Sequence, residues 1–370
     1  MNFSRKIPVG ISQCAMGDAV RFNGGHKHSK VCTELLGQCF EYVPLCPEVA
    51  IGMGVPRKPI HLLVQKASAP VDAVRVIGVE NPEVDVTEPL RAYADSVVPE
   101  LARVRGYIFM QNSPSCGLHG VRRYLDNGHG IDSEGVGVFA RRLQQQFPHL
   151  PMEEVGRLNN SELRENFLTR VFAYDAWFRY VENVAEVGAE ENEGAKLTEG
   201  KQAEQVSAKT WDQQWDKQWH DKLRGKTGKP LSRIARIIEF YTAYKYLLLA
   251  HHQEQTRELG RLLADSKAMS EDALAFEVRG RIMQILSRPA SRKDRTNALM
   301  HSAGHLREFL DKQEKAELKA LIDEYRLGYK PLSAVLTLLR HYIPRSPHSF
   351  IHSQVLLAAE PAELGLCDFH

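Results

Sequence analysis

The chain has 370 residues, a net charge of +2, 43% hydrophobic residues and 25% charged residues. This length predicts two domains, because it exceeds what one ordinary hydrophobic core needs, and the composition is that of a soluble protein. No apolar run approaches the roughly 20 residues of a membrane helix, and the start of the chain lacks the apolar stretch of a signal peptide. We therefore expect a cytoplasmic protein without a membrane span, whose six cysteines are thiols or metal ligands.

Residues 1–180 alternate short apolar runs with helical patterns, of which His28–Phe40 is one. Four of the apolar runs are typical of β-strands: Ile7–Ser12, Tyr42–Leu45, Val74–Val79 and Tyr107–Met110. Strands that alternate with helices indicate a mixed or parallel sheet with flanking helices. We therefore expect an α/β domain over this part of the chain.

The composition changes between residues 181 and 229. The segment begins with an acidic stretch that is poor in apolar residues, which is typical of a linker. Trp211, Trp215 and Trp219 follow at a spacing of four, so they would share one face of a helix. We expect this stripe to dock the linker helix onto a neighbouring domain, and the alternative is a surface on which nucleobases stack.

From residue 230 to 370 the chain is predicted to form an all-α domain. Apolar residues recur there at spacings of three and four, which is the pattern of amphipathic helices. Residues 231–346 carry 20 Lys and Arg against 14 Asp and Glu, and residues 288–295 (RPASRKDR) are especially basic. Such an excess fits a surface that contacts phosphate, and a solvated helical face is the alternative.

Three cysteines each follow one of the predicted strands. Cys14, Cys46 and Cys116 lie shortly after their apolar runs. Residues beyond the carboxyl ends of strands converge on ligands in open α/β sheets, so we expect these thiols to meet. The alternative is that they pack as small hydrophobic residues. Cys32 and Cys39, in a helical pattern, are expected to be packed in that way.

The number of converging thiols indicates which metal they would bind. Thiolates favour zinc or iron–sulfur clusters. A structural zinc site usually contains close pairs such as C-x-x-C, and the sequence has none. Three thiolates on a 4Fe-4S cluster leave one iron without a protein ligand, and an open iron is a soft Lewis acid. The three cysteines therefore predict chemistry on a sulfur-containing substrate in preference to electron transfer.

Three short motifs contain the cysteines: S-x-C at residues 12–14, C-P-E at 46–48 and S-P-S-C-G at 113–117. With VRFNGGHK at residues 20–27, they resemble the thiouracil desulfidase family, whose pattern in this last segment is VRYDGGHK. The resemblance covers about residues 5–180, and Asn23 stands where the family usually has Asp. Residues further along, 230–345, resemble the all-helical YbgA-type domain that is found fused to this family.

The resemblance implies a non-redox reaction in which a thiolated pyrimidine and water give the oxo base and hydrogen sulfide. It implies a 4Fe-4S cluster with three cysteine ligands (Cys14, Cys46, Cys116) and one open iron to which the substrate sulfur binds. The fused architecture implies 4-thiouracil and 4-thiouridine in tRNA as substrates. It also suggests that the helical domain is the part that binds tRNA.

Residues beside the cysteines supply candidate catalytic groups. Addition of water to the thiocarbonyl carbon requires proton transfer, for which Glu48, two residues after Cys46, is the best-placed group. Ser113 and Ser115, beside Cys116, are expected to orient the base or the water. The alternatives are that Glu48 caps the helix after Cys46 and that the serines satisfy loop backbone groups.

Substrate binding is expected from two asparagines and a glycine pair. Asn23 and Asn112 offer amide donors and acceptors to base edges, and Gly24 and Gly25 let backbone approach a ligand closely. A competing interpretation is a regulator in which a cluster senses oxidants and the helical domain binds nucleic acid, without catalysis. A zinc-stabilised RNA-binding protein is a further one. The oligomeric state stays open.

Overall fold

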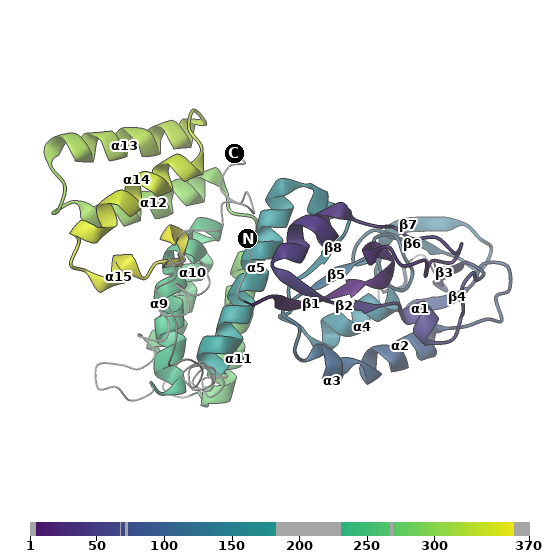
Figure 1. Cartoon of the computed structure of the whole chain (residues 1–370). Coiled ribbons are helices and arrows are strands. Elements are labelled where there is room, and N and C mark those ends of the chain that lie inside the picture. The colour runs from purple at the N-terminus through teal and green to yellow at the C-terminus, as the bar shows by residue number, and fades with distance from the viewer. Residues whose placement is uncertain (1–4, 67, 71–72, 183–230, 267–268, 359–370) are drawn as a thin grey trace, which may run out of the picture. The chain divides into compact units, whose positions relative to one another are not determined.

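The computed structural model describes residues 5–66, 68–70, 73–182, 231–266 and 269–358 (Figure 1). The described residues form two compact units. The first is Arg5–Phe167, and the second begins at Leu168. The division falls within helix α5 (Ser161–Trp177), upstream of the predicted boundary at residue 180. The predicted linker lies almost entirely outside the described residues, and so do its three tryptophans (Trp211, Trp215, Trp219).

Sheet A of the first unit consists of four parallel strands in the order β2-β1-β5-β8. The strands are β1 (Ile7–Ser12), β2 (Phe40–Leu45), β5 (Tyr107–Phe109) and β8 (Met152–Glu154). Three of the predicted apolar runs form β1, β2 and β5, and β1 has the predicted bounds. The two central strands, β1 and β5, are almost entirely buried, as expected of parallel strands with both faces covered.

Sheet B is mixed, with strand order β4-β3-β6-β7. Its strands are β3 (Ile60–Leu63), β4 (Arg75–Gly78), β6 (Val121–Tyr124) and β7 (Gly130–Gly135). Strand β3 runs parallel to β6, whereas β4 and β7 each run antiparallel to their neighbour. One parallel and one mixed sheet confirm the predicted α/β class of this unit.

Four helices accompany the two sheets: α1 (Pro47–Ala50), α2 (Thr87–Ser96), α3 (Val98–Leu101) and α4 (Val138–Gln146). The helical pattern predicted for His28–Phe40 forms only short π-helical and 3-10 turns, Val31–Leu35 and Leu36–Gln38. Cys32 and Cys39 are buried in this segment, as predicted, and the exposed fractions of the two residues are 0% and 1%.

The second unit is helical in its described part, which confirms the predicted all-α class. After α5 its helices are α9 (Arg233–His251), α10 (Gln253–Ala264), α11 (Glu271–Ser287), α12 (Arg292–Leu306), α13 (Lys312–Leu327), α14 (Leu332–Tyr342) and α15 (Ser349–His352). Polar side chains cap several of them, and Asp311 and Glu314 form a capping box at α13. Within the described ranges, no helix is long and apolar enough to cross a membrane.

Candidate active site

The carboxyl ends of β2, β1 and β5 lie at one edge of sheet A, because these neighbouring strands are parallel. Cys14 lies in the 3-10 turn that follows β1, and Cys46 directly follows β2. Cys116 lies in the turn after β5. The structure brings these three thiols together, close enough to affect one another electrostatically.

Burial opposes ionisation of all three thiols. It raises the pKa of Cys14 to about 11, with a further contribution from nearby Cys46. Burial is also the main cause that raises the pKa of Cys46 and of Cys116, and the Glu48 carboxylate adds to both. Cationic iron that replaces the thiol protons would remove this penalty, so the donor chemistry fits a metal group.

The geometry of the thiols differs from that of a single-ion site. Among the residues that the structure describes, no three Cys, His, Asp or Glu side chains are placed to hold one metal ion. Thiolates on a cluster bind different irons, so they do not have to meet at one point. The Tyr107 hydroxyl is buried without a hydrogen-bond partner and interacts electrostatically with the three thiols. A cluster sulfide would be an acceptor for this orphan donor.

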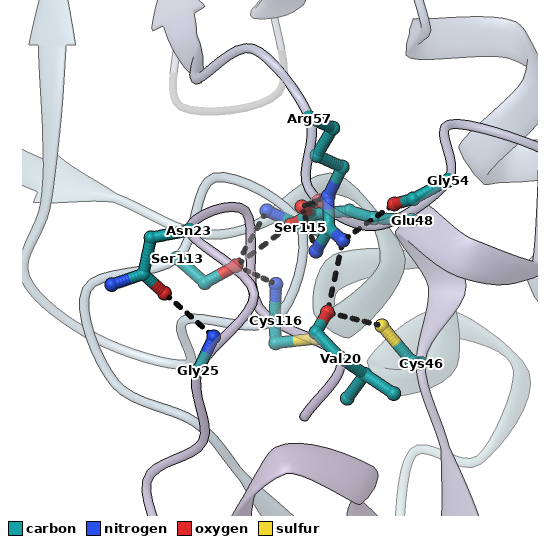
Figure 2. Close-up of polar contacts among 10 residues, drawn as sticks. All are labelled: Val20, Asn23, Gly25, Cys46, Glu48, Gly54, Arg57, Ser113, Ser115 and Cys116. Atoms are coloured by element: carbon teal, nitrogen blue, oxygen red, sulfur yellow. Dashed lines mark hydrogen bonds and ion pairs between the residues drawn. The ribbon is translucent and has the colours of Figure 1, made fainter. Parts of the chain in front are cut away.

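Glu48 lies in the first turn of α1, and its carboxylate is held on both oxygens (Figure 2). Oε2 accepts from Nε of Arg57 and forms an ion pair with Nη2, both at 2.7 Å. Oε1 accepts from Oγ of Ser115 at 2.8 Å and from Oγ of Ser113 at 3.4 Å. These contacts are all with side chains of other segments, and Glu48 also lies in the first turn of α1, where a carboxylate is favoured.

The two serines share Oε1 of Glu48 and differ in their other contacts. Oγ of Ser113 accepts the backbone N–H of Ser115 at 3.2 Å and that of Cys116 at 3.1 Å. Ser113 thus satisfies loop backbone and shapes the turn that carries Cys116, which was one of the alternatives for this residue. Ser115 is fully buried and donates its hydroxyl proton to Glu48, so it links the turn to the carboxylate.

The start of α4 supports the same turn. The backbone N–H of Gly137 donates to the carbonyl of Gly117 at 2.7 Å, and that of Val138 donates to the carbonyl of Pro114 at 3.0 Å. A Cβ at Gly137 would lie 2.5 Å from the backbone carbonyl of Ser115, so only glycine allows this close approach. The backbone around Cys116 is therefore fixed on two sides.

The predicted substrate-binding residues lie in turns. The side-chain oxygen of Asn23 accepts the N–H of Gly25 at 3.1 Å, and Gly24 has a φ of +72°, which suits glycine (Figure 2). Asn112 also has a positive φ, +60°, and is exposed. Within the described part of the chain, no hydrogen bond joins Asn23 or Asn112 to the carboxylate of Glu48.

Arg57 is the residue of this site that sequence reasoning missed. It lies in the loop between α1 and β3, where a basic side chain is ordinarily solvated. Its side chain is only 5% exposed because it reaches inward to Glu48. No spacing or motif in the sequence indicates this role of Arg57, because its contact with Glu48 depends on the path of the loop.

Comparisons with known proteins give one match in the α/β part of the chain and another in the helical part. Residues 9–155 match the family model described as 2-thiouracil desulfurase. Residues 245–361 match a model described as a protein of unknown function, DUF1722. The chain is also similar to a solved structure, the 4Fe-4S-dependent thiouracil desulfidase TudS, with 24% identity and a TM-score of 0.31 over 42% of this chain and 94% of that one.

A curated relative is the uncharacterized protein YbgA of Escherichia coli strain K12. It is 35% identical over 131 residues, which is 35% of this chain and 78% of YbgA. The predicted fusion of a thiouracil desulfidase domain with a YbgA-type helical domain is therefore confirmed. Through its helical domain the chain belongs to the family of YbgA, and that domain follows a segment that matches the 2-thiouracil desulfurase family model.

Proposed function

We propose that the α/β domain removes sulfur from thiolated pyrimidines such as 4-thiouracil, with water as the second substrate and the oxo base and hydrogen sulfide as products. The match of residues 9–155 to the 2-thiouracil desulfurase family supports the substrate class. The observation that carries the proposal is the convergence of three thiols, one buried and two half-buried, at one edge of sheet A, beside the Glu48 carboxylate.

Cys14, Cys46 and Cys116 would hold a 4Fe-4S cluster at this edge. When bound by three protein thiolates, such a cluster supplies an open iron, which is a soft Lewis acid with affinity for sulfur. The protein contributes the shape of the site, because Ser113 and Gly137 fix the turn around Cys116. Cys116 is buried, and Cys14 and Cys46 are half-buried.

Glu48 is the group that moves protons in this proposal. Replacing a C=S bond by C=O requires that water lose its protons and that the departing sulfur gain them. A carboxylate within hydrogen-bond reach of water can do both in turn. Ser115 and Arg57 each occupy one oxygen of Glu48 and so fix its orientation. Asn23 and the glycine pair at positions 24 and 25 form the turn that would contact the pyrimidine.

The helical unit is proposed to bind RNA, so that 4-thiouridine in tRNA is also a substrate. In the basic run 288–295, Arg288 and Lys293 are exposed. Arg292 has a structural role instead, since Nη1 donates to the carbonyl of Tyr325 at 2.7 Å and its guanidinium stacks on that ring. Two of the four basic residues of the run are therefore exposed and remain candidates for phosphate contacts.

The proposed function is tested on protein purified without oxygen. Iron and acid-labile sulfide are counted, and release of uracil from 4-thiouracil is followed by chromatography. We expect about four irons and four sulfides per chain for one cluster, and uracil formation that depends on them. Protein that carries a full cluster and forms no uracil from 4-thiouracil would show that the domain does not act on this base.

A further inference from the structure

Arg57 connects two parts of the proposed site through one buried guanidinium (Figure 2). On one side, Nε and Nη2 contact Oε2 of Glu48, both at 2.7 Å. On the other side, Nη1 donates to the backbone carbonyls of Val20 at 2.9 Å and Gly54 at 3.0 Å. The fork of N–H groups is thus divided between a carboxylate and backbone oxygens.

The carbonyl of Val20 begins the loop that carries the asparagine and the glycine pair. Arg57 holds this loop a second time, because its backbone N–H donates to the carbonyl of Phe22 at 2.8 Å. The Val20 carbonyl also accepts from Sγ of Cys46 at 3.8 Å, which places it beside a thiol. At its far end the loop is held by the N–H of Lys27, which donates to the carbonyl of Cys14 at 2.9 Å.

A buried ion pair alone would be weak grounds for a functional role. Arg123 and Asp132, in sheet B, form such a pair, and the Arg123 side chain is 4% exposed, which nearly matches Arg57. In the part of the chain that the structure describes, no hydrogen bond or ion pair joins that pair to the three thiols, Ser113 or Ser115, so it serves as a comparison. Arg57 differs because its partners are the proposed proton-transfer group and the loop beside the cysteines.

We propose that Arg57 is a positioning residue for the desulfuration described above, an inference that rests on that proposed function. The guanidinium holds Oε2 of Glu48, which leaves Oε1 facing Ser115, and it holds residues 20–22 against Cys46. One side chain therefore sets the relative position of the carboxylate and the loop. Lysine cannot replace it, because a single ammonium group lacks the planar fork that binds both partners.

The first test compares Arg57→Gln and Arg57→Lys in the full chain loaded with its cluster. Both variants are expected to retain iron and sulfide and to lose about 10²-fold in kcat/KM for 4-thiouracil, since small displacements of catalytic groups cost rates of this order. Loss of Arg57 should have a smaller effect on kcat in a Glu48→Gln background, because its action on the rate passes through that carboxylate. Full activity of Arg57→Lys would overturn the proposal, because charge alone would then suffice.

The second test does not depend on activity. Trypsin cleaves after Arg21 and Lys27, which flank the loop that Arg57 holds. We expect Arg57→Gln to be cut there at least about tenfold faster than the wild type, because local opening exposes the loop. The matched control Arg123→Gln should leave both the cleavage at these sites and the kinetics unchanged. Equal cleavage of wild type and Arg57→Gln would overturn the tether to the loop.

The two tests separate the inference from the function on which it rests. If the cluster-loaded wild type forms no uracil, the proposed function fails, and the cleavage rates still decide whether Arg57 holds the loop. If the wild type is active and Arg57→Gln has wild-type kcat and KM, the proposed function stands and the positioning role is wrong. Thermal unfolding of each variant shows whether the fold itself has been lost.

Discussion

The hydroxyl of Ser115 donates a hydrogen bond of 2.8 Å to Oε1 of Glu48, across 67 positions of sequence. The contact exists because Glu48 follows β2 and Ser115 follows β5, on opposite sides of β1 in the same parallel sheet. It joins a carboxylate two residues from Cys46 to a hydroxyl next to Cys116. The proposed proton-transfer group and two of the proposed ligands are thus held in one network.

Replacement of any one of Cys14, Cys46 and Cys116 by serine should abolish binding of the cluster, because a hydroxyl is a poor ligand for soft iron. Iron and sulfide content and the visible absorption of anaerobically purified protein measure this loss. Cys32→Ser is the matched control, since Cys32 is also buried but packs away from the site. Three variants that keep a full cluster would show that other residues ligate it.

Glu48→Gln should retain the cluster and lose about 10²- to 10⁴-fold in kcat, the range for removal of a general acid–base group. The amide keeps the shape of the side chain and can still accept from Ser115, while its NH2 group then faces the donors of Arg57, so thermal unfolding is measured beside the activity. Steady-state turnover of 4-thiouracil measures the effect. A variant with wild-type kcat would leave Glu48 with only a structural role.

Gly137→Ala should destabilise the first unit by about 1–3 kcal/mol, as overpacked sites generally do. The added Cβ would lie 2.5 Å from backbone atoms of Ser115, which cannot yield without moving the turn that carries Cys116. The midpoint of thermal unfolding measures the change. Gly130→Ala is the control, because a Cβ there meets only the Tyr124 ring at 3.7 Å; equal effects of the two substitutions would contradict this account.

The buried His251 makes the helical unit sensitive to acid. Burial lowers its pKa from 6.5 to about 4, and its Nδ1 lies 2.6 Å from the carbonyl oxygen of Arg288. Between these two pH values the unfolded chain takes up a proton that the folded chain does not. The free energy of unfolding should therefore fall as pH drops from 6.5 toward 4. The contribution of the neutral His251 side chain to this free energy is fully present above pH 6.5.

Urea unfolding of the full chain at a series of pH values, followed by helical circular dichroism, measures this dependence. His251→Gln cannot take up the proton, so its free energy of unfolding should decline less over that interval. His301→Gln serves as the control, because His301 is exposed. An unchanged pH dependence in the His251 variant would show that other groups cause it.

The affinity of the full chain for tRNA should fall steeply as salt rises, because each phosphate contact releases condensed counterions. Combined replacement of Arg288 and Lys293 by glutamine should weaken binding and reduce the salt slope. Titration by fluorescence anisotropy at several salt concentrations measures both quantities. Lys312→Gln, an exposed charge on α13, should have no effect. Binding that does not change with salt would leave the helical unit without a phosphate-binding role.

The parallel core of the first unit was predictable because its strands are short, continuous apolar runs. Ile7–Ser12 is buried on both faces and has no competing interpretation as a surface helix. Strand β8 was missed because Glu153 and Glu154 are buried there, and their carboxylates accept from the Arg157 side chain and from backbone N–H groups. Strand β7 was missed because it is polar and half of its residues are exposed.

The sequence predicted the site residues that closely follow strands. It did not predict the site residue that lies in a loop far from a strand end. Cys14, Cys46 and Glu48 all lie within three residues of a strand end, so the topology of the sheet fixes their edge. Arg57 reaches Glu48 only through the path of residues 51–57, which no sequence period specifies. The turn that holds Asn112 likewise depends on its positive φ and not on a pattern.

The most direct test of the central claim is the stoichiometry of one reaction. Cluster-loaded protein is incubated without oxygen with 4-thiouracil, in water enriched in the heavy oxygen isotope. We expect uracil and sulfide to form in equal amounts, the new oxygen of uracil to carry the label, and Cys46→Ser to form neither product. Uracil without the label, or equal turnover by Cys46→Ser, would contradict sulfur removal by water at the three-thiol site.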